Sequence, residues 1–297
     1  MYKIKTSLFV KQNSVECAFS DAASWVILNP IELSIKNKIE KVGVPLKDWD
    51  IKIYRGILTG CNEAFIISEQ RRNEILSWCR NESEKHRTDE LIRPILRGRD
   101  IKRYGYSFAN LYLIASHNGI PDKNIPRINI DEYPAVKRHL DQYWDKISKR
   151  ADMGDTPYNL RSCAYMDDFS KQKIVWGEIS DRTKFALDSN GDFMPEATSF
   201  LLTGNNLEYL VCFLNSPLSE YLFSKIGTTT GVGTVRWKKF KLEQLCVPTY
   251  NVDFHFFQRH LKDYLKSKDE KNLTIINQRI YRICSLTTEE IKFIESH

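Results

Sequence analysis

The sequence has no long apolar run and no paired cysteines. A membrane-spanning helix needs about 18 or more consecutive apolar residues, and the sequence contains no such run. The start, Met1 to Lys5, leads into mixed polar sequence and not into the apolar core of a signal peptide. The 7 cysteines are odd in number and scattered, without a Cys-x-x-Cys pair for zinc or thiol exchange. We therefore expect a protein of the reducing cytoplasm that neither enters a membrane nor needs disulfides or a metal.

Two catalytic motifs are also missing. A DNA amino-methyltransferase holds its flipped base with Asn/Asp-Pro-Pro-Tyr/Phe, and Asn29-Pro30-Ile31-Glu32 lacks the second proline and the aromatic. The common metal-dependent nucleases show Pro-Asp followed by Asp/Glu-x-Lys, and Pro121-Asp122 has no such partner nearby. The stretch 227–234 is rich in glycine and threonine but lacks the lysine of a phosphate-binding loop. The sequence thus predicts no methyl transfer, no DNA cleavage and no cofactor of its own.

What the sequence does have is a mild positive charge gathered in two places. In 297 residues, 44 Lys and Arg against 38 Asp and Glu give a net charge of +6, too small an excess to identify a partner. The first basic cluster comprises Arg93, Arg97, Arg99, Lys102 and Arg103. The second surrounds two aromatic residues, Trp237 and Phe240, and comprises Arg236, Lys238, Lys239 and Lys241. Clustered cations are typical of surfaces that bind phosphates.

The apolar periodicity predicts an α+β fold with mixed sheet. A helix begins after Asn29 and ends at Gly43. Short runs of β-branched and aromatic residues predict strands over 51–57, 64–67, 111–114, 174–179 and 198–202. Helical spacing recurs over 131–150, on both sides of Asn215-Ser216-Pro217, and from Phe254 onward. We expect a lead-in over 1–20, a mixed-sheet domain over 21–250 and a helical C-terminal tail over 251–297.

The second basic cluster directly follows the Gly/Thr stretch 227–234, which we expect to be a mobile loop. Next come Arg236, Trp237, Lys238 and Lys239. Backbone amides and cations at such a loop would meet phosphates, while the indole of Trp237 can pack or stack at the DNA face. The alternative is a solvated helix start with a tryptophan in the core.

Polar side chains at the ends of predicted strands are the other binding candidates. His117 and Asn118 follow the strand over 111–114, where binding loops commonly start. Further along lie Tyr158, Asn159 and Arg161. The alternative for His117 and Asn118 is an ordinary turn.

Several short motifs follow one another along the chain. The most specific are Arg55-Gly56-Ile57-Leu58-Thr59-Gly60 and Ile92-Arg93-Pro94-Ile95-Leu96-Arg97-Gly98-Arg99-Asp100-Ile101. After them come Trp176-Gly177-Glu178, Phe213-Leu214-Asn215-Ser216, the Gly/Thr stretch with Trp237, and Val247-Pro248. Over roughly residues 20–250 the sequence resembles the C-terminal specificity domain of TaqI-like, type IIG and phage-exclusion adenine-specific DNA methyltransferases.

The resemblance implies a target-recognition domain that clamps duplex DNA opposite a methyltransferase domain using S-adenosylmethionine. The basic clusters would contact phosphates, and loops after the strands would read base edges. In that family the catalytic domain normally precedes this region. We therefore expect either a fragment of such an enzyme, possibly one that also cleaves DNA, or a stand-alone specificity subunit that docks on a separate methyltransferase. Two alternatives remain open: an enzyme with unrecognised motifs, and a protein-interaction module that uses the helical tail.

Overall fold

The structure is a computed structural model that describes residues 28–229 and 233–296. The lead-in expected over 1–20 lies outside these ranges, as do residues 230–232 of the Gly/Thr stretch. None of the helices in the described ranges is both long and apolar enough to cross a membrane.

A central antiparallel sheet divides the molecule into two cores. Its strand order is β10-β8-β12-β2. The strands are β2 (Ile51–Arg55), β8 (Lys173–Gly177), β10 (Phe185–Asp188) and β12 (Ser199–Gly204). Successive side chains of a strand point to opposite faces: Ile174 and Trp176 join the first hydrophobic cluster and Val175 the second. The sheet is therefore buried on both faces, which agrees with the apolar run of β8.

The first core is built from helices near both ends of the described chain. The helices are α2 (Pro30–Val42), α8 (Leu207–Leu214), α9 (Pro217–Ile226), α10 (Lys239–Leu242), α11 (Phe254–Ser267), α12 (Lys271–Ile283) and α13 (Thr288–Glu295). A two-stranded sheet of β1 (Gly43–Pro45) and β15 (Cys246–Pro248) ties residues after α2 to residues before α11. The tail packs tightly on α8, with the rings of Tyr209 and Phe257 4.7 Å apart.

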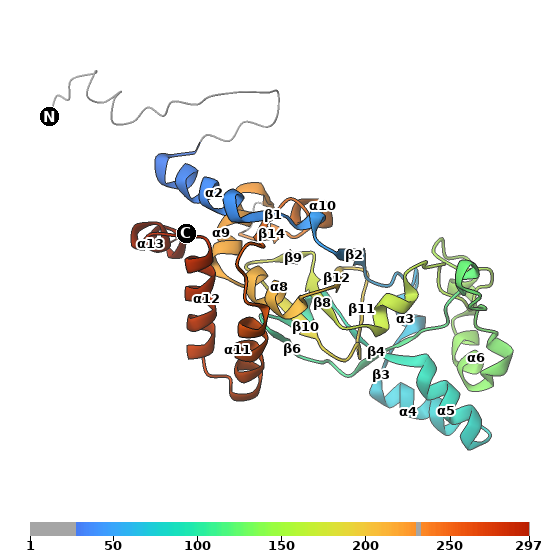
Figure 1. The fold of residues 1–297 in the computed structure, drawn as a ribbon. Helices are drawn as coiled ribbons and strands as arrows, with labels where there is room; N and C mark the ends of the chain where they lie inside the picture. Colours follow the sequence, from blue (N-terminus) through green and yellow to red (C-terminus); the bar gives the residue numbers. More distant parts are fainter. Residues whose placement is uncertain (1–27, 230–232, 297) are drawn as a thin grey trace, which may run out of the picture.

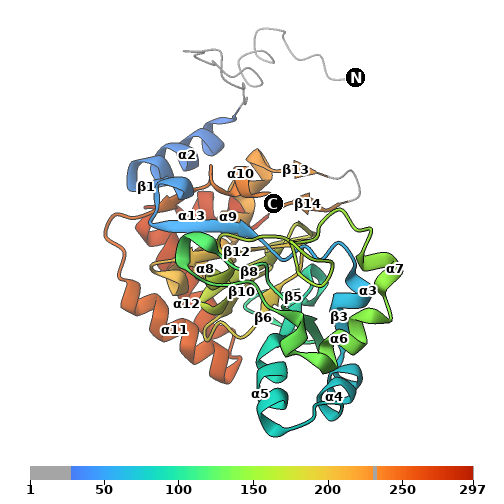
Figure 2. The same ribbon diagram turned by 90° about the vertical axis from the view of Figure 1, so that its right-hand side faces the viewer.

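The second core forms around a mixed sheet of order β11-β4-β7-β3, in which only β11 and β4 run parallel. The strands are β3 (Ile66–Ser68), β4 (Ile92–Leu96), β7 (Leu111–Ile114) and β11 (Met194–Pro195). The helices that cover it are α3 (Asn62–Phe65), α4 (Glu69–Ser77), α5 (Glu82–Leu91), α6 (Pro134–Asp141) and α7 (Trp144–Ile147). Figure 1 shows α11–α13 at one end of the molecule and α4–α6 at the other, and Figure 2 shows the central strands between α11–α12 and α3–α6.

Short elements connect these layers. A three-stranded sheet contains β9 (Ile179–Ser180), β13 (Thr228–Thr229) and β14 (Val235–Arg236), and a hairpin contains β5 (Ile101–Lys102) and β6 (Gly105–Tyr106). The short 3₁₀ helices are η1 (Leu46–Asp48), η2 (Gly98–Asp100), η3 (Pro121–Lys123), η4 (Ile130–Glu132) and η5 (Met166–Ser170).

The α+β class and most of the predicted elements are confirmed. Asn29 caps α2 through a complete capping box with Glu32, and β7 has the predicted bounds. Two predictions are wrong in detail. The run 64–67 begins in helix α3 because a short apolar run suits a helix or a strand equally. The helix expected over 131–150 is broken after α6.

Candidate nucleic-acid interface

The first basic cluster lies on a turn that is braced by its own carboxylate. Arg97 donates from Nε and Nη2 to the two oxygens of Asp100, both at 2.8 Å. Burial alone would raise the pKa of Asp100, but the bonds from Arg97 outweigh burial and lower that pKa. Asp100 is 5% exposed, so the carboxylate is largely removed from water, while the Arg97 side chain is partly exposed. The guanidinium of Arg97 is thus already engaged in holding the shape of this turn.

Gly98 brings the turn against the end of β8. A Cβ on Gly177 would lie 3.0 Å from the Cα of Gly98, so only two glycines allow the backbones to cross this closely. The crossing leaves the next residue, Arg99, at the surface. Among the described residues Arg99 makes no ion pair, and exposed Lys102 donates to its carbonyl at 2.8 Å. Arg99 and Lys102 are therefore the cations of the first basic cluster that can contact an anionic partner.

Arg103, by contrast, is tied to the first core. It donates from Nη2 to the carbonyl of Asn215 at 2.8 Å and lies over the ring of Tyr104. Asn215 belongs to the Phe-Leu-Asn-Ser motif, and its amide bonds to the backbone of Phe185 through both the oxygen and the nitrogen. This motif is therefore a brace between α8 and the central sheet.

The second basic cluster requires a correction at Trp237. Its side chain is 3% exposed, stacks on Phe223 at 3.9 Å and meets Phe185 edge-on at 5.5 Å. The prediction that Trp237 stacks on DNA is wrong, because this side chain fills the first core. The exposed aromatic residue is Phe240, which is 53% exposed. The position of Phe240 between Lys239 and Lys241 was the feature of the sequence that could have indicated its exposure.

The cations of the second cluster differ in how far they are engaged. Arg236 pairs with Glu178 at 3.2 Å, and Lys239 reaches Glu243 at 3.7 Å. Lys238 forms no ion pair in the ranges that the structure covers. Surface pairs of this kind contribute little to stability and can exchange partners readily. Lys238 and Lys239 are thus accessible to phosphates.

The structure brings together the five polar candidates from the strand-end loops. His117 and Asn118 lie beside the loop 152–162, which carries Tyr158, Asn159 and Arg161. The backbone N–H of Leu160 donates to the carbonyl of Ser116 at 2.8 Å, which fixes the loop along the end of β7. This proximity was not deducible from spacing, because about forty residues of intervening chain separate the two segments.

The two asparagines hold this loop from inside. The amide of Asn118 donates to Asp155 at 2.9 Å and to Ser162 at 2.8 Å, and its oxygen accepts from the backbone of Asp155. Asn159 is 1% exposed and donates to the carbonyl of Ile128 at 2.9 Å. A DNA contact by Asn159 was predicted wrongly, because the side chain is buried. Sequence reasoning could not distinguish a bracing amide from a reading amide.

The other two candidates in the loop 152–162 differ in exposure, since Tyr158 is half-buried and Arg161 is exposed. The Tyr158 hydroxyl donates to Asp141 at 2.6 Å, and burial together with that carboxylate raises the pKa of Tyr158 to about 12. The Arg161 side chain is 65% exposed and pairs with Asp152 at 3.3 Å. Arg161 is therefore the candidate of this loop that is best placed to reach a partner.

A series of short contacts leads from the loop 152–162 to the second basic cluster, and the turn of the first cluster joins it where Gly98 lies against Gly177 and Thr198. Gly60 packs against Asp152, Arg55 donates to the carbonyl of Ala197 at 2.7 Å, and the backbone N–H of Glu178 donates to Thr198 at 2.9 Å. Trp237 then donates its backbone N–H to Glu178 at 2.7 Å. We call this path the interface strip: residues 152–162, 55–60, 197–198, Arg99, Lys102, Ile179 and 236–240. Its exposed residues include Arg55, Arg99, Ile179, Lys239 and Phe240.

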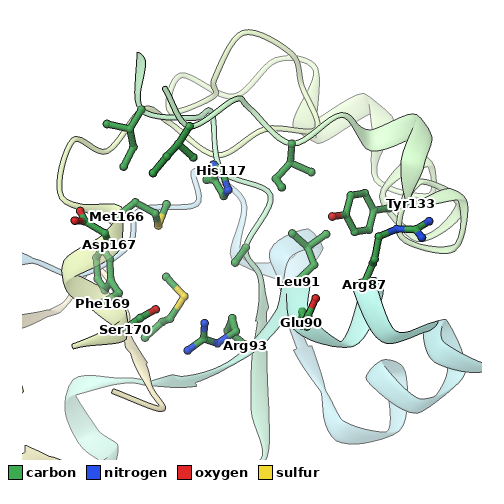
Figure 3. Close-up of a pocket in the computed structure, with 15 residues that line it drawn as sticks. Arg87, Glu90, Leu91, Arg93, His117, Tyr133, Met166, Asp167, Phe169 and Ser170 are labelled. Atoms are coloured by element: carbon green, nitrogen blue, oxygen red, sulfur yellow. The ribbon is translucent and has the colours of Figure 1, made fainter. Parts of the chain in front are cut away.

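A cavity of about 320 Å³ lies beside His117 (Figure 3). Apolar side chains such as Met166 and Phe169 line it together with Arg93, Tyr133 and His117. The Nδ1 atom of His117 accepts the backbone N–H of Gly119 at 3.0 Å, and burial lowers the pKa of His117. The lowered pKa favours the neutral imidazole, and the hydrogen bond from Gly119 favours the tautomer in which Nε2 carries the hydrogen. The structure places His117 in the wall of this cavity, and its contact with DNA stays a prediction.

Comparison with known proteins gives one family match. The model of the TaqI-like C-terminal specificity domain matches residues 93–247. This range contains the Arg97 turn, the loop 152–162 and the second basic cluster, and the match confirms the predicted resemblance over residues 93–247. The motif over 55–60 lies outside the matched range.

Individual relatives are distant. The type II methyltransferase M.BstVI of Geobacillus stearothermophilus is 20% identical over 281 residues, covering 92% of this chain and 47% of that protein. The type IIG restriction endonuclease BpuSI is similar in fold, with a TM-score of 0.51 and 12% identity over 84% of this chain and 32% of that one. The type IIL restriction-modification enzyme MmeI, solved in complex with DNA, has a TM-score of 0.58 and 10% identity over 85% of this chain and 35% of that one. The chain thus spans about half the length of the methyltransferase and about a third of each of the two solved structures.

Proposed function

Because the chain belongs to the family of TaqI-like C-terminal specificity domains, we propose that it recognises a DNA sequence on behalf of a restriction-modification enzyme. The observation that carries the proposal is the interface strip. It joins exposed cations, an exposed aromatic residue and a braced polar loop along one path of contacts, and these are the features that duplex recognition combines.

The strip suggests a division of labour. Arg99, Lys102, Lys238 and Lys239 contact phosphates, which fixes the position of the module but carries no base information. The loop 152–162 reads base edges in a groove. The chemistry belongs to a methyltransferase domain that is specific for adenine and binds S-adenosylmethionine, either in the same protein or in a separate subunit. Methyl transfer and cleavage are not activities of the residues in this chain.

The test is the salt dependence of DNA binding. Each phosphate that the protein neutralises adds about 0.9 to the slope of log affinity against log salt for duplex DNA. We expect a steep slope for the unaltered chain, measured by fluorescence anisotropy with a labelled duplex. Replacing Lys238 and Lys239 together by Ala should lower the slope by about 0.9 for each phosphate that is no longer neutralised, and it should weaken the binding of all duplexes alike.

A matched control removes two exposed lysines from the tail helix α11. The double change Lys262→Ala and Lys266→Ala has the same effect on net charge but lies outside the interface strip. If both double variants lowered the slope equally, binding would depend on net charge alone and the strip would not be the interface. Affinity that hardly changed with salt in the unaltered chain would contradict the proposed function itself.

A further inference from the structure

Arg150 is a buried cation that is surrounded by carbonyl oxygens. It is 7% exposed, and its Nη1 donates to the carbonyl of Thr59. Its Nη2 donates to the carbonyls of Pro157, at 3.1 Å, and Asn159. The guanidinium carbon lies 4.3 Å from the centre of the Phe65 ring. Among the described residues no carboxylate pairs with it.

A buried charge without a carboxylate partner costs stability unless its donors are well satisfied. The two terminal nitrogens of the Arg150 guanidinium meet this requirement with carbonyl oxygens from two separate segments, while its buried Nε has no hydrogen-bond partner among the described residues. The planar fork holds these two donors in a fixed geometry, which an ammonium group at the end of a flexible side chain does not reproduce. One segment is the turn at Thr59; the other is the loop 152–162, held near its end at Asn159. Arg150 therefore fixes the loop against the turn that follows β2.

The opposite side of the loop is held independently by Asn118, whose amide bonds to Asp155 and Ser162. An antiparallel bridge between Met153 and Leu160 closes the loop on itself. With both sides anchored, the backbone of the loop has a defined conformation in the absence of any partner. Preorganisation of this kind reduces the entropy lost on binding.

The exposed side chains of the loop have the chemistry of base recognition. Arg161 is 65% exposed and Asp155 61% exposed at the side chain, and Met153 is 41% exposed. In the major groove, arginine pairs with guanine, a carboxylate accepts from the cytosine amino group, and apolar atoms contact the thymine methyl group. Arg161 and Asp155 are now paired with Asp152 and Arg127, at 3.3 and 3.4 Å, and both ion pairs are exposed enough to exchange for base edges.

We propose that the loop 152–162 is the base-reading element and that Arg150 is its positioning residue. This inference rests on the proposed DNA-binding function and assigns sequence discrimination to one segment. Arg150 itself does not contact DNA. It acts by holding Arg161 and Asp155 where a groove can receive them.

The experiment begins by selecting preferred sequences from a pool of random duplexes with the unaltered chain. Affinity for a selected duplex is then compared with affinity for a scrambled duplex of the same composition. We expect Arg150→Lys to lower this ratio by about 5-fold to 150-fold, the range for one well-formed pairing between a side chain and a base. Affinity for the scrambled duplex and its salt slope should stay unchanged, because the phosphate contacts are elsewhere on the strip.

Two further variants keep the test decisive. Lys149→Ala removes a neighbouring exposed cation and should leave the ratio unchanged. Asn118→Ala frees the other side of the loop without leaving a buried charge, and it should lower the ratio even if Arg150→Lys fails to fold, which circular dichroism would reveal.

The outcomes separate the two proposals. A ratio that Arg150→Lys and Asn118→Ala both preserve would overturn this inference and leave the proposed function intact. An equal drop in affinity for selected and scrambled duplexes would also overturn it, because the loop would then serve general binding. An unaltered chain that binds no duplex would refute the proposed function and this inference together.

Discussion

Replacing Trp237 by Ala should destabilise the fold strongly and affect DNA binding only through that destabilisation. The indole stacks on Phe223 at 3.9 Å, meets Phe185 edge-on and is 3% exposed. Truncation of a buried tryptophan removes the transfer free energy of the indole and leaves a cavity, together about 3 to 5 kcal/mol. The backbone carbonyl of Trp237, which accepts from Trp176 Nε1 at 2.9 Å, is retained in the variant and does not add to this cost.

The assay is urea unfolding at equilibrium, followed by circular dichroism and intrinsic fluorescence. Phe240→Ala is the matched control, because Phe240 lies three residues along the chain and is 53% exposed. Its free energy of unfolding should change by no more than about 0.5 kcal/mol, while its affinity for duplex DNA should fall. A Trp237→Ala variant that unfolded at the same urea concentration as the unaltered chain would refute the assignment of this side chain to the core.

Three further predictions concern the scaffold and the chemistry. Burial would raise the pKa of Glu290, but hydrogen bonds from Lys38, Ser34 and the backbone of Thr287 lower this pKa to about 2. The ionised carboxylate therefore stabilises the folded state above pH 4.5, and this stabilisation is lost as the pH falls toward 2. Glu290→Gln should therefore cost about 2 kcal/mol at pH 7 and flatten the fall in stability between those pH values, measured by urea unfolding. Gly56→Ala should lower the melting temperature clearly, because a Cβ there would lie 2.2 Å from the backbone oxygen of Glu196, whereas Gly105→Ala, with nothing within 4 Å, should hardly change it. The purified chain incubated with DNA and labelled S-adenosylmethionine should transfer no label; methylated DNA would mean that a catalytic site went unrecognised.

The elements that were predictable from the sequence are those specified by neighbours in the chain. Asn29 and Thr287 begin α2 and α13 through capping boxes that are visible as residue patterns. A short run of apolar and aromatic residues placed β7, and Asn215-Ser216-Pro217 correctly marked the break between α8 and α9.

The elements that escaped prediction depend on distant partners. Nothing near Trp237 in the chain reveals that Phe223 and Phe185 enclose it, and the cations around it favoured an exposed position. Arg150 drew no attention because its partners are backbone carbonyls, which leave no trace in residue identity. The pairing of Arg97 with Asp100 was the one local signal that could have been used, since three residues separate a guanidinium from a carboxylate.

The burial of the central sheet on both faces has a consequence for how the chain folds. Strands β2 and β12 are direct neighbours, with Tyr54 opposite Leu201, although residues 56–198, which supply nearly all of the second core, lie between them in the chain. Neither core can be completed before this long-range pairing forms, and loops of this length close slowly. During synthesis, the apolar faces of α2 and β2 therefore stay exposed to solvent until β12 and α8 have been made. Folding should be late, cooperative and slow for a protein of this size, and the interval before it is when the chain is most exposed to aggregation.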